Sequence, residues 1–169
     1  MRVHELLTES FESPFPYRAN WEEETDDDED SPYYQQEIPH GLQTVRFTTD
    51  DGITYLWYAR SSNYDDHFWE IAFGVDSGRV SHRGDTMIDI KRTGTGNQMR
   101  VFATIMAITT DFVEYFDDYV HQIYFTADTE DGNRARLYKR MAEKYFDNFN
   151  ITNIDKDGEV YRFTLTRQY

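Results

Sequence analysis

Residues 90–98 combine glycines with basic and polar side chains in a pattern that could bind an anion. The stretch reads IKRTGTGNQ, which predicts the end of a strand, a glycine-containing turn and the start of a helix. Glycines let the backbone approach a ligand closely, and the first turn of a helix offers free N–H groups at its positive dipole end. A phosphate or pyrophosphate would be stabilised there, and Lys91, Arg92 and Arg100 would add positive charge. An ordinary turn explains the same glycines.

A second stretch, residues 133–146, is rich in basic side chains. It holds five of the protein's 17 lysines and arginines, namely Arg134, Arg136, Lys139, Arg140 and Lys144. This face could hold an anionic ligand, pair with acidic residues elsewhere, or be solvated. Tyr138 lies at helical spacing with Met141 and Ala142, which is typical of a half-buried core tyrosine. The functional alternative is a proton donor, because a phenol can protonate a thiolate leaving group.

Other chemistries find little support in the residues. The chain has no cysteine, which excludes disulfides, thiolate metal sites, iron–sulfur clusters and a cysteine nucleophile. The histidines show no i,i+4 metal spacing, and Asp65-Asp66-His67 is more typical of a polar loop than of a metal site. No Gly-x-Ser-x-Gly elbow or P-loop is present.

The elements that must position these residues begin at residue 42. Alternating or β-branched and aromatic runs predict four strands, at 42–49, 53–60, 68–75 and 86–92. Asp51-Gly52 is a common hairpin turn pair, and short links imply an antiparallel meander. A helix is then expected over 98–117, because its apolar residues recur at helical spacing: Val101, Phe102, Ile105, Ile108, Phe112, Val113 and Phe116.

The rest of the chain predicts a strand at 122–127, a helix at about 133–146, and strands at 149–154 and 159–166. The order is β-β-β-β-α-β-α-β-β, so the fold class is α+β, with a mixed, mostly antiparallel sheet of about seven strands and two main helices. The first helix joins the fourth and fifth strands, and a right-handed crossover would make those two strands parallel.

The N-terminal arm, residues 1–41, differs in composition from the predicted domain at 42–169. Residues 1–42 hold 12 acids and 2 bases, and the remainder holds 20 acids and 15 bases, within a total net charge of −15. All four prolines lie in the arm, which we expect to be partly disordered, with the acidic run 22–30 solvated and little contribution to the core. The start of the arm could dock on another surface through its apolar residues, Leu6, Leu7, Phe11, Phe15, Tyr17 and Trp21.

Charge and hydropathy also bear on location and partners. The acidic field disfavours nucleic acid and anionic membranes as partners. No signal peptide and no run approaching the ~20 apolar residues of a membrane span are visible. A cytoplasmic protein is therefore expected, in the host cytoplasm or a virion if the chain comes from a phage.

The element order and two motifs resemble the GNAT superfamily of acyl-CoA N-acyltransferases over roughly residues 42–169. The fourth strand of that family ends in Gln/Arg-x-x-Gly-x-Gly/Ala, and Lys91-x-x-Gly94-x-Gly96 stands at the matching place. The resemblance implies that acetyl-CoA or another acyl-CoA binds at this turn. Implied cofactor-binding residues are Lys91, Arg92, Gly94, Thr95, Gly96, Asn97, Gln98 and, from the family's Asn-x-x-Ala-x-x-x-Tyr pattern, Asn133.

The same resemblance implies catalytic roles. Tyr138, in the helix after the fifth strand, would protonate the departing thiolate. The acceptor, an unknown amine, must lose a proton, and Glu70 on the third strand and Asp89 on the fourth are candidate bases, although each could be an exposed or paired strand acid.

Three functions from different classes therefore stay open. The first is an enzyme that transfers an acyl group to an amine. The second is a non-catalytic protein on a GNAT-like scaffold, a phage structural or host-interaction protein that binds a partner through its acidic arm. It rests on the short link at residues 50–52, which leaves no room for the two helices that family members carry there. The opening residues also resemble the N-termini of tailed-phage proteins. The third, an acidic DNA mimic, ranks last.

Overall fold

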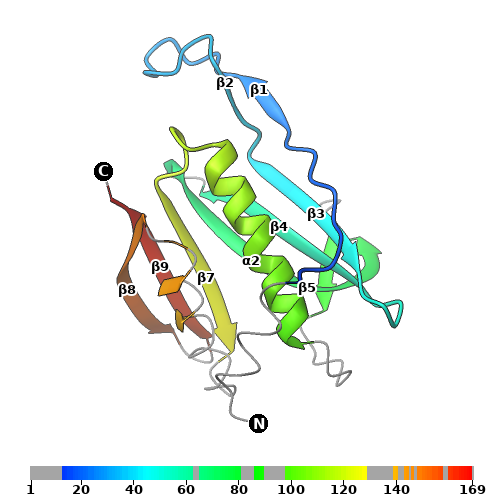
Figure 1. Ribbon diagram of the computed structural model, residues 1–169. Coiled ribbons are helices and arrows are strands. Elements are labelled where there is room, and N and C mark those ends of the chain that lie inside the picture. The colour runs from blue at the N-terminus through cyan, green and yellow to red at the C-terminus, as the bar shows by residue number, and fades with distance from the viewer. Residues whose placement is uncertain are drawn as a thin grey trace. The chain divides into compact units, whose positions relative to one another are not determined.

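The computed structural model has an α+β fold with a mixed sheet (Figure 1). It describes residues 13–62, 65–80, 86–89, 98–128, 139–140, 143–144, 146, 148–157 and 160–168. The elements are β1 (Glu23–Thr25), β2 (Glu37–Pro39), β3 (Leu42–Thr48), β4 (Thr54–Ser62), β5 (Asp65–Val80), β6 (Thr86–Asp89), α2 (Gln98–Tyr115), β7 (Gln122–Asp128), β8 (Phe149–Asp157) and β9 (Val160–Arg167). No helix among the described residues is long and apolar enough to cross a membrane.

The strand order is β3-β4-β5-β7-β9-β8, with β6 paired to β5, and β1 and β2 form a separate pair. The predicted α+β class with a mixed sheet is confirmed. The two-helix count stays a prediction, because most of the second helix expected at 133–146 lies outside the described residues. By internal contacts the chain forms two units. The first comprises Met1–Asn20, Thr44–Tyr58 and Phe73–Thr109, and the second comprises Trp21–Gln43, Ala59–Ala72 and Thr110–Tyr169.

In the first unit, the two local patterns of the sequence produce the expected elements. β3 buries Val45 and Phe47 with exposed residues between them, which is the period of two of a half-buried strand. Gly52 closes the turn to β4 with φ of 82°, a conformation that glycine adopts without steric cost. On α2, the residues of this unit predicted to be apolar, Val101, Phe102, Ile105 and Ile108, are all buried.

The N-terminal arm contributes to this core, contrary to expectation. Phe15 is only 1% exposed, and its ring stacks on Phe47 at 6.3 Å between centroids. Its backbone N–H donates to Thr104 Oγ1 of α2 at 2.8 Å, and Tyr17 forms an isolated bridge with Phe47. Phe15 and Tyr17, two of the aromatic residues that could dock the arm, therefore contact this unit, whereas Leu6, Leu7 and Phe11 lie outside the described residues.

β5 is longer than the predicted strand at 68–75. It continues to Val80 and pairs with β6 in antiparallel fashion, with Val75 opposite Asp89 and Val80 opposite Thr86. The register shifts between Asp76 and Val80. Four residue steps on β5 match two on β6 there, so the irregularity accommodates two extra residues, and β5 continues through Ser77-Gly78 although both are turn-forming types.

In the second unit, the sheet contains its parallel pair. Residues Phe68–Ile71 of β5 run parallel to Gln122–Phe125 of β7, and β7 and β8 both pair with β9 in antiparallel fashion (Figure 1). We expected strand 122–127 to be parallel to strand 86–92, and this assignment was wrong for the described residues. The long β5 provides the parallel partner through its first half, and β6 pairs with its second half.

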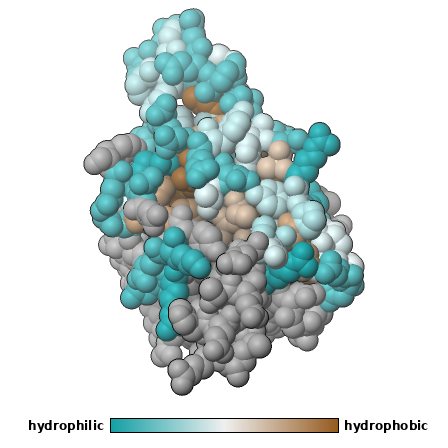
Figure 2. Space-filling view, viewed as in Figure 1, coloured by the Kyte–Doolittle hydropathy of each residue, from teal (hydrophilic) through white to brown (hydrophobic). Residues whose placement is uncertain are grey.

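The acidic run 22–30 supplies β1, which pairs with β2 in a short two-stranded ribbon with Glu24 opposite Ile38, and its aspartates lie in the connection after β1. Asp26 is 9% exposed, and its carboxylate accepts hydrogen bonds from the Asp28 N–H and the Ser31 hydroxyl. Its neighbours in the run are exposed, and the segment is hydrophilic over most of its surface at the top of Figure 2. Residues 23–25 and 37–39 of the arm are therefore paired strands, whereas the acids of the run other than Asp26 are exposed to solvent, as expected.

Candidate functional site

The predicted cofactor turn lies mostly outside the described residues. This applies to Lys91, Arg92, Gly94, Thr95, Gly96 and Asn97 of the turn, and to Asn133 and Tyr138. The flanking elements are in place, because β6 ends at Asp89 and α2 begins at Gln98. Residues 90–97 therefore connect a strand to a helix, as the sequence predicts, and the first turn of α2 carries no acidic side chain.

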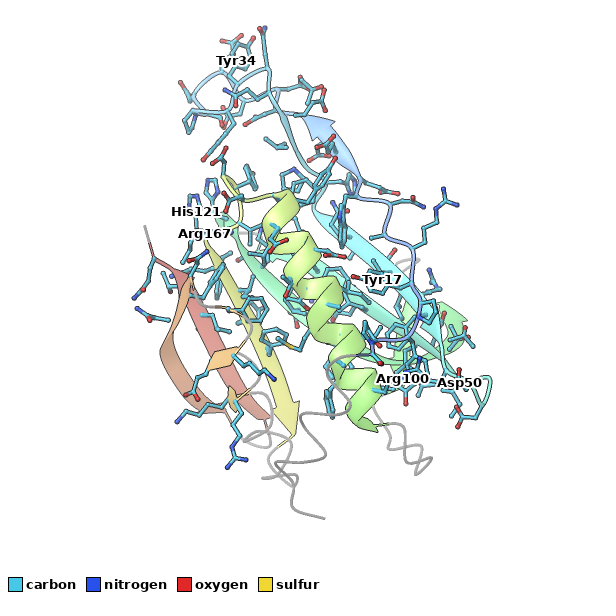
Figure 3. The ribbon with its side chains drawn as sticks, in the orientation of Figure 1. Tyr17, Tyr34, Asp50, Arg100, His121 and Arg167 are labelled. Carbon is cyan, nitrogen blue, oxygen red and sulfur yellow. The ribbon has the colours of Figure 1, made fainter. Side chains whose placement is uncertain are left out.

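Arg100, which we expected to add positive charge near that turn, has several partners of its own. Its Nη1 lies 3.0 Å from Asp50 Oδ2, and its Nε–H donates to the Ser13 carbonyl at 2.8 Å (Figure 3). The guanidinium carbon lies 4.0 Å from the centre of the Phe15 ring. Arg100 therefore fastens the N-terminal arm to the start of α2, and its charge is balanced by Asp50.

The two candidate bases have different surroundings. Glu70 forms an ion pair with Arg60, with Oε2 and Nη2 2.7 Å apart. Its side chain is 19% exposed, against 56% for the arginine. Glu70 is therefore a paired acid on a strand, which is the alternative to its role as a base. Asp89 is the last residue of β6, and its side chain is outside the described set. A catalytic role for either residue stays a prediction.

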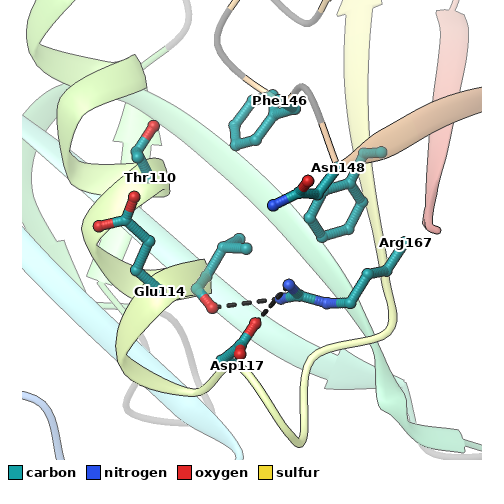
Figure 4. A pocket seen from close by; sticks show the side chains of 8 residues that line it. Thr110, Glu114, Asp117, Phe146, Asn148 and Arg167 are labelled. Atoms are coloured by element: carbon teal, nitrogen blue, oxygen red, sulfur yellow. Dashed lines mark hydrogen bonds and ion pairs between the residues drawn. The ribbon is translucent and has the colours of Figure 1, made fainter. Parts of the chain in front are cut away.

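The second unit contains a cavity that the sequence did not point to. It has a volume of about 380 Å³, which is within the usual range of small-molecule sites. Its walls come from the end of α2, the segment that leads into β8, and the end of β9 (Figure 4). The lining residues are Thr110, Val113, Glu114, Asp117, Phe146, Asn148, Phe149 and Arg167.

Arg167 contacts several groups at the wall of this cavity. Its side chain is 7% exposed, and it donates to the carbonyls of Val113 and Val120 at 3.2 and 3.1 Å. It also forms an ion pair with Asp117 (Figure 4). The guanidinium carbon lies 4.7 Å from the centre of the Phe149 ring. Arg167 thus supplies a cation to the carbonyl end of α2, where the helix dipole favours positive charge.

The other polar groups of the cavity have fewer contacts. Glu114 is exposed, and its carboxylate forms no ion pair within the described part of the chain. The Thr110 hydroxyl is buried and lacks a hydrogen-bond partner there. A buried polar atom without a partner is rare in folded proteins and calls for an explanation.

A signal in the sequence could have revealed that a cation lies at the end of α2. Asp111, Glu114, Asp117 and Asp118 cluster at the end of the predicted helix, and the last turn of α2 holds no basic residue. Acids at a helix C-terminus are unfavourable, so a cation from another element was to be expected. Its identity as Arg167 could not be deduced, because it lies 54 residues beyond Val113. No group of three potential metal ligands occurs among the described residues.

Comparisons with known proteins give structural similarity only. No family model and no curated protein matches the sequence. The spermidine/spermine N-acetyltransferase SpeG from Vibrio cholerae, solved with manganese ions, is similar with a TM-score of 0.48 and 13% identity, over 92% of this chain and 94% of that one. A putative acetyltransferase of the GNAT family from Desulfovibrio desulfuricans gives 0.45 and 10%, over 75% and 69%. Mutant forms of SpeG give 0.44 and 14%, over 75% and 68%. All three TM-scores are below 0.5.

Proposed function

We propose that this protein is an acyl-CoA-dependent N-acyltransferase that transfers an acetyl or other acyl group to an amine. One observation carries the proposal: β6 ends at Asp89 and α2 begins at Gln98, so that Lys91-x-x-Gly94-x-Gly96 occupies a strand-to-helix connection. The first turn of α2 is free of acidic side chains, so no carboxylate of its own helix competes for the N–H groups there. These groups suit the pyrophosphate of an acyl-CoA.

In this proposal each step falls to a residue of the chain. The backbone of residues 94–98 binds the pyrophosphate, and Glu70 or Asp89 accepts a proton from the acceptor amine, directly or through water. The amine nitrogen then bonds to the acyl carbon, the carbon–sulfur bond of the thioester breaks, and Tyr138 donates its proton to the departing thiolate. Coenzyme A supplies the activated acyl group.

Calorimetric titration with acetyl-CoA tests the proposal. The native protein should bind it, and Gly96→Trp should abolish binding because an indole at the turn blocks backbone approach. Gly52→Asn is a matched control, since the space around Gly52 is open and asparagine tolerates its positive φ. Absence of any heat at about millimolar acetyl-CoA, in protein that is folded by circular dichroism, would rule the proposal out.

A second candidate function is favoured by the β1–β2 ribbon. Glu22–Glu24 and Asp27–Asp30 are exposed, and Tyr34, in the same ribbon, is 39% exposed (Figure 3). The alternative proposal is a non-catalytic interaction protein, in a phage or its host, that binds a basic partner through these carboxylates. Such a surface would attract cationic partners at a rate that falls with salt.

The structure suggests a sharper test of this alternative than removal of the arm, because truncation would also remove the buried Phe15. Residues Asp27, Asp28 and Asp30 can be changed to asparagine while Asp26, which holds the turn, is kept. A partner captured by the native protein from host extract should then be lost. The control is an equal change in charge on the domain, at Asp50, Asp111 and Asp118. Equal capture by both proteins would eliminate the ribbon as the binding element.

A further inference from the structure

We propose that the turn between β3 and β4 is a latent modification site, at which Asp51 is converted to isoaspartate, and that Thr49 restrains this conversion. Asp51 and Gly52 are both exposed. An aspartate followed by glycine offers the least steric hindrance to the reaction, because glycine lacks a Cβ. No residue predicted to bind a cofactor or to catalyse acyl transfer belongs to this turn. The inference therefore goes beyond the proposed function and does not depend on it.

The reaction needs only the protein and water. The Gly52 amide nitrogen loses its proton and attacks Cγ of the protonated Asp51 carboxyl group. The new N–Cγ bond closes a five-membered succinimide ring, while a carboxyl C–O bond breaks and its oxygen leaves as water. Water then reopens the ring. Opening at the α-carbonyl leaves isoaspartate, whereas opening at Cγ restores aspartate, so the net change is an isomerisation without change in mass or oxidation state.

The nitrogen that must attack is held by a hydrogen bond. The Gly52 N–H donates to the Thr49 carbonyl at 3.0 Å, and the Thr49 N–H donates to the Ile53 carbonyl at 2.9 Å. These contacts close the loop Asp50–Gly52, in which Gly52 has φ of 82°, as in hairpin loops that end in a left-handed glycine. The loop must open locally before the Gly52 nitrogen can turn toward Cγ.

The carboxyl group that must be attacked is held by the same threonine. The Thr49 hydroxyl donates to the Asp51 carboxylate and accepts a hydrogen bond from the Ile53 N–H at 3.2 Å. Thr49 is 5% exposed, so its hydroxyl is fixed inside a turn that is otherwise exposed. A donated hydrogen bond stabilises the ionised carboxylate, whereas the protonated group is the one that cyclises. Thr49 thus restrains both reacting groups, one through its carbonyl and one through its side chain.

The conversion would also disturb the contact that fastens the N-terminal arm. Asp50 Oδ2 lies 3.0 Å from Arg100 Nη1, and the Arg100 Nε–H donates to the Ser13 carbonyl at 2.8 Å (Figure 3). In isoaspartate the main chain runs through Cβ and Cγ, which inserts an extra atom between Asp50 and Gly52. The lengthened chain cannot form the same loop, so Asp50 would lose its fixed position beside Arg100.

The experiment compares the full chain with a synthetic peptide of residues 44–58, both kept at neutral pH and body temperature for several weeks. Digestion and liquid chromatography then quantify the isoaspartyl form at Asp51, because it elutes separately at unchanged mass. The native protein should convert at least about tenfold more slowly than the peptide, since two hydrogen bonds of ordinary net strength must break first. This comparison needs no variant, so it tests the inference even if a substituted chain fails to fold.

Three variants locate the restraint in one hydroxyl. Thr49→Val keeps the shape and removes the hydroxyl, so Asp51 should convert about fivefold faster than in the native protein. Thr49→Ser keeps the hydroxyl and should stay within about twofold of the native rate. Thr48→Val is the matched control and should do the same, because Thr48 is exposed and its hydroxyl contacts Thr54.

Three results would each overturn the inference. The first is a native protein that converts as fast as the peptide. The second is a folded Thr49→Val variant with the native rate. The third is a Thr48→Val variant that converts as fast as Thr49→Val, because the effect would then be a general loosening of the hairpin.

Discussion

Two arginines lie at opposite ends of α2, and both contact a backbone carbonyl, a carboxylate and an aromatic ring. Arg100 belongs to the first turn of α2, and Arg167 of β9 donates to the Val113 carbonyl near its end. Arg100 contacts the Ser13 carbonyl, the Asp50 carboxylate and the Phe15 ring. Arg167 contacts two carbonyls, the Asp117 carboxylate and the Phe149 ring. Their side chains differ in burial, with 33% exposed for Arg100 and 7% for Arg167.

The difference follows from the helix dipole and from what each arginine holds. A cation in the first turn of a helix gains nothing from the dipole, whereas a cation at the last carbonyls does. Arg100 therefore acts as a surface fastener for the arm. Arg167 donates to the backbone carbonyls of two buried residues, Val113 and Val120, and a buried carbonyl that loses a hydrogen-bond partner is costly. We therefore expect similar contacts to contribute more to the free energy of unfolding at Arg167 than at Arg100.

The largest expected effect is that of Arg167→Met. Methionine keeps much of the side-chain volume and removes the hydrogen bonds to Val113 and Val120, so we expect the free energy of unfolding to fall by about 3 kcal/mol. Urea denaturation followed by circular dichroism measures it. Arg167→Lys is the control for charge alone and should recover only part of the loss, because an ammonium cannot match the planar fork. A loss below that of Arg100→Met would contradict the comparison.

Phe15→Leu should come next, at about 1.5 kcal/mol. The substitution removes the ring that stacks on Phe47 and lies under Arg100, while it keeps an apolar side chain in a buried position. The same urea titration measures the loss. If the Phe15→Leu variant were as stable as the native protein, Phe15 would not contribute to the core. Arg100 would then not stabilise the fold by fastening the arm.

Arg100→Met should cost less, about 1 kcal/mol, because the ion pair and the carbonyl contact are partly solvated. A second readout separates fastening from charge: limited proteolysis near Ser13 should become faster. The double variant with Phe15→Leu should lose less than the sum of the two single losses, since both residues hold the same segment. Strict additivity would mean that Arg100 and Phe15 act independently.

The sequence predicted correctly those elements whose formation depends on residues close together in the chain. The alternation of β3, the turn at Gly52 and the apolar face of α2 each depend on residues a few positions apart. The extension of β5 to Val80 could not be predicted, because pairing with β6 overrides the turn preference of Ser77-Gly78. The parallel partner of β7 could not be predicted for the same reason, because the partner is the first half of the long strand β5.

The candidate sites show the same limit, because features set by neighbouring residues were predictable and contacts between residues far apart in the chain were not. The strand-to-helix position of the glycine turn was evident from residues 90–98, since β6 and α2 are each local patterns. The partners of Arg100 and Arg167 were not, because Asp50 and Val113 lie 50 and 54 residues from them along the chain. A basic residue in a sequence shows a charge, and only the fold shows whether that charge is already balanced.

The smallest expected losses in the free energy of unfolding are those from removing the two carboxylates that pair with the arginines. Comparing these losses with those of the arginine substitutions shows which contacts of each arginine matter most. Asp117 and Asp50 are 67% and 81% exposed, so Asp117→Asn and Asp50→Asn should each cost about 0.5 kcal/mol. That is about half of the loss for Arg100→Met and about a sixth of the loss for Arg167→Met. Both carboxylate effects should nearly vanish in about 1 M NaCl, where surface pairs are screened. The loss from Arg167→Met should persist there, because carbonyl hydrogen bonds are not screened in that way. If Asp117→Asn proved as damaging as Arg167→Met, the ion pair and not the helix carbonyls would account for the burial of Arg167.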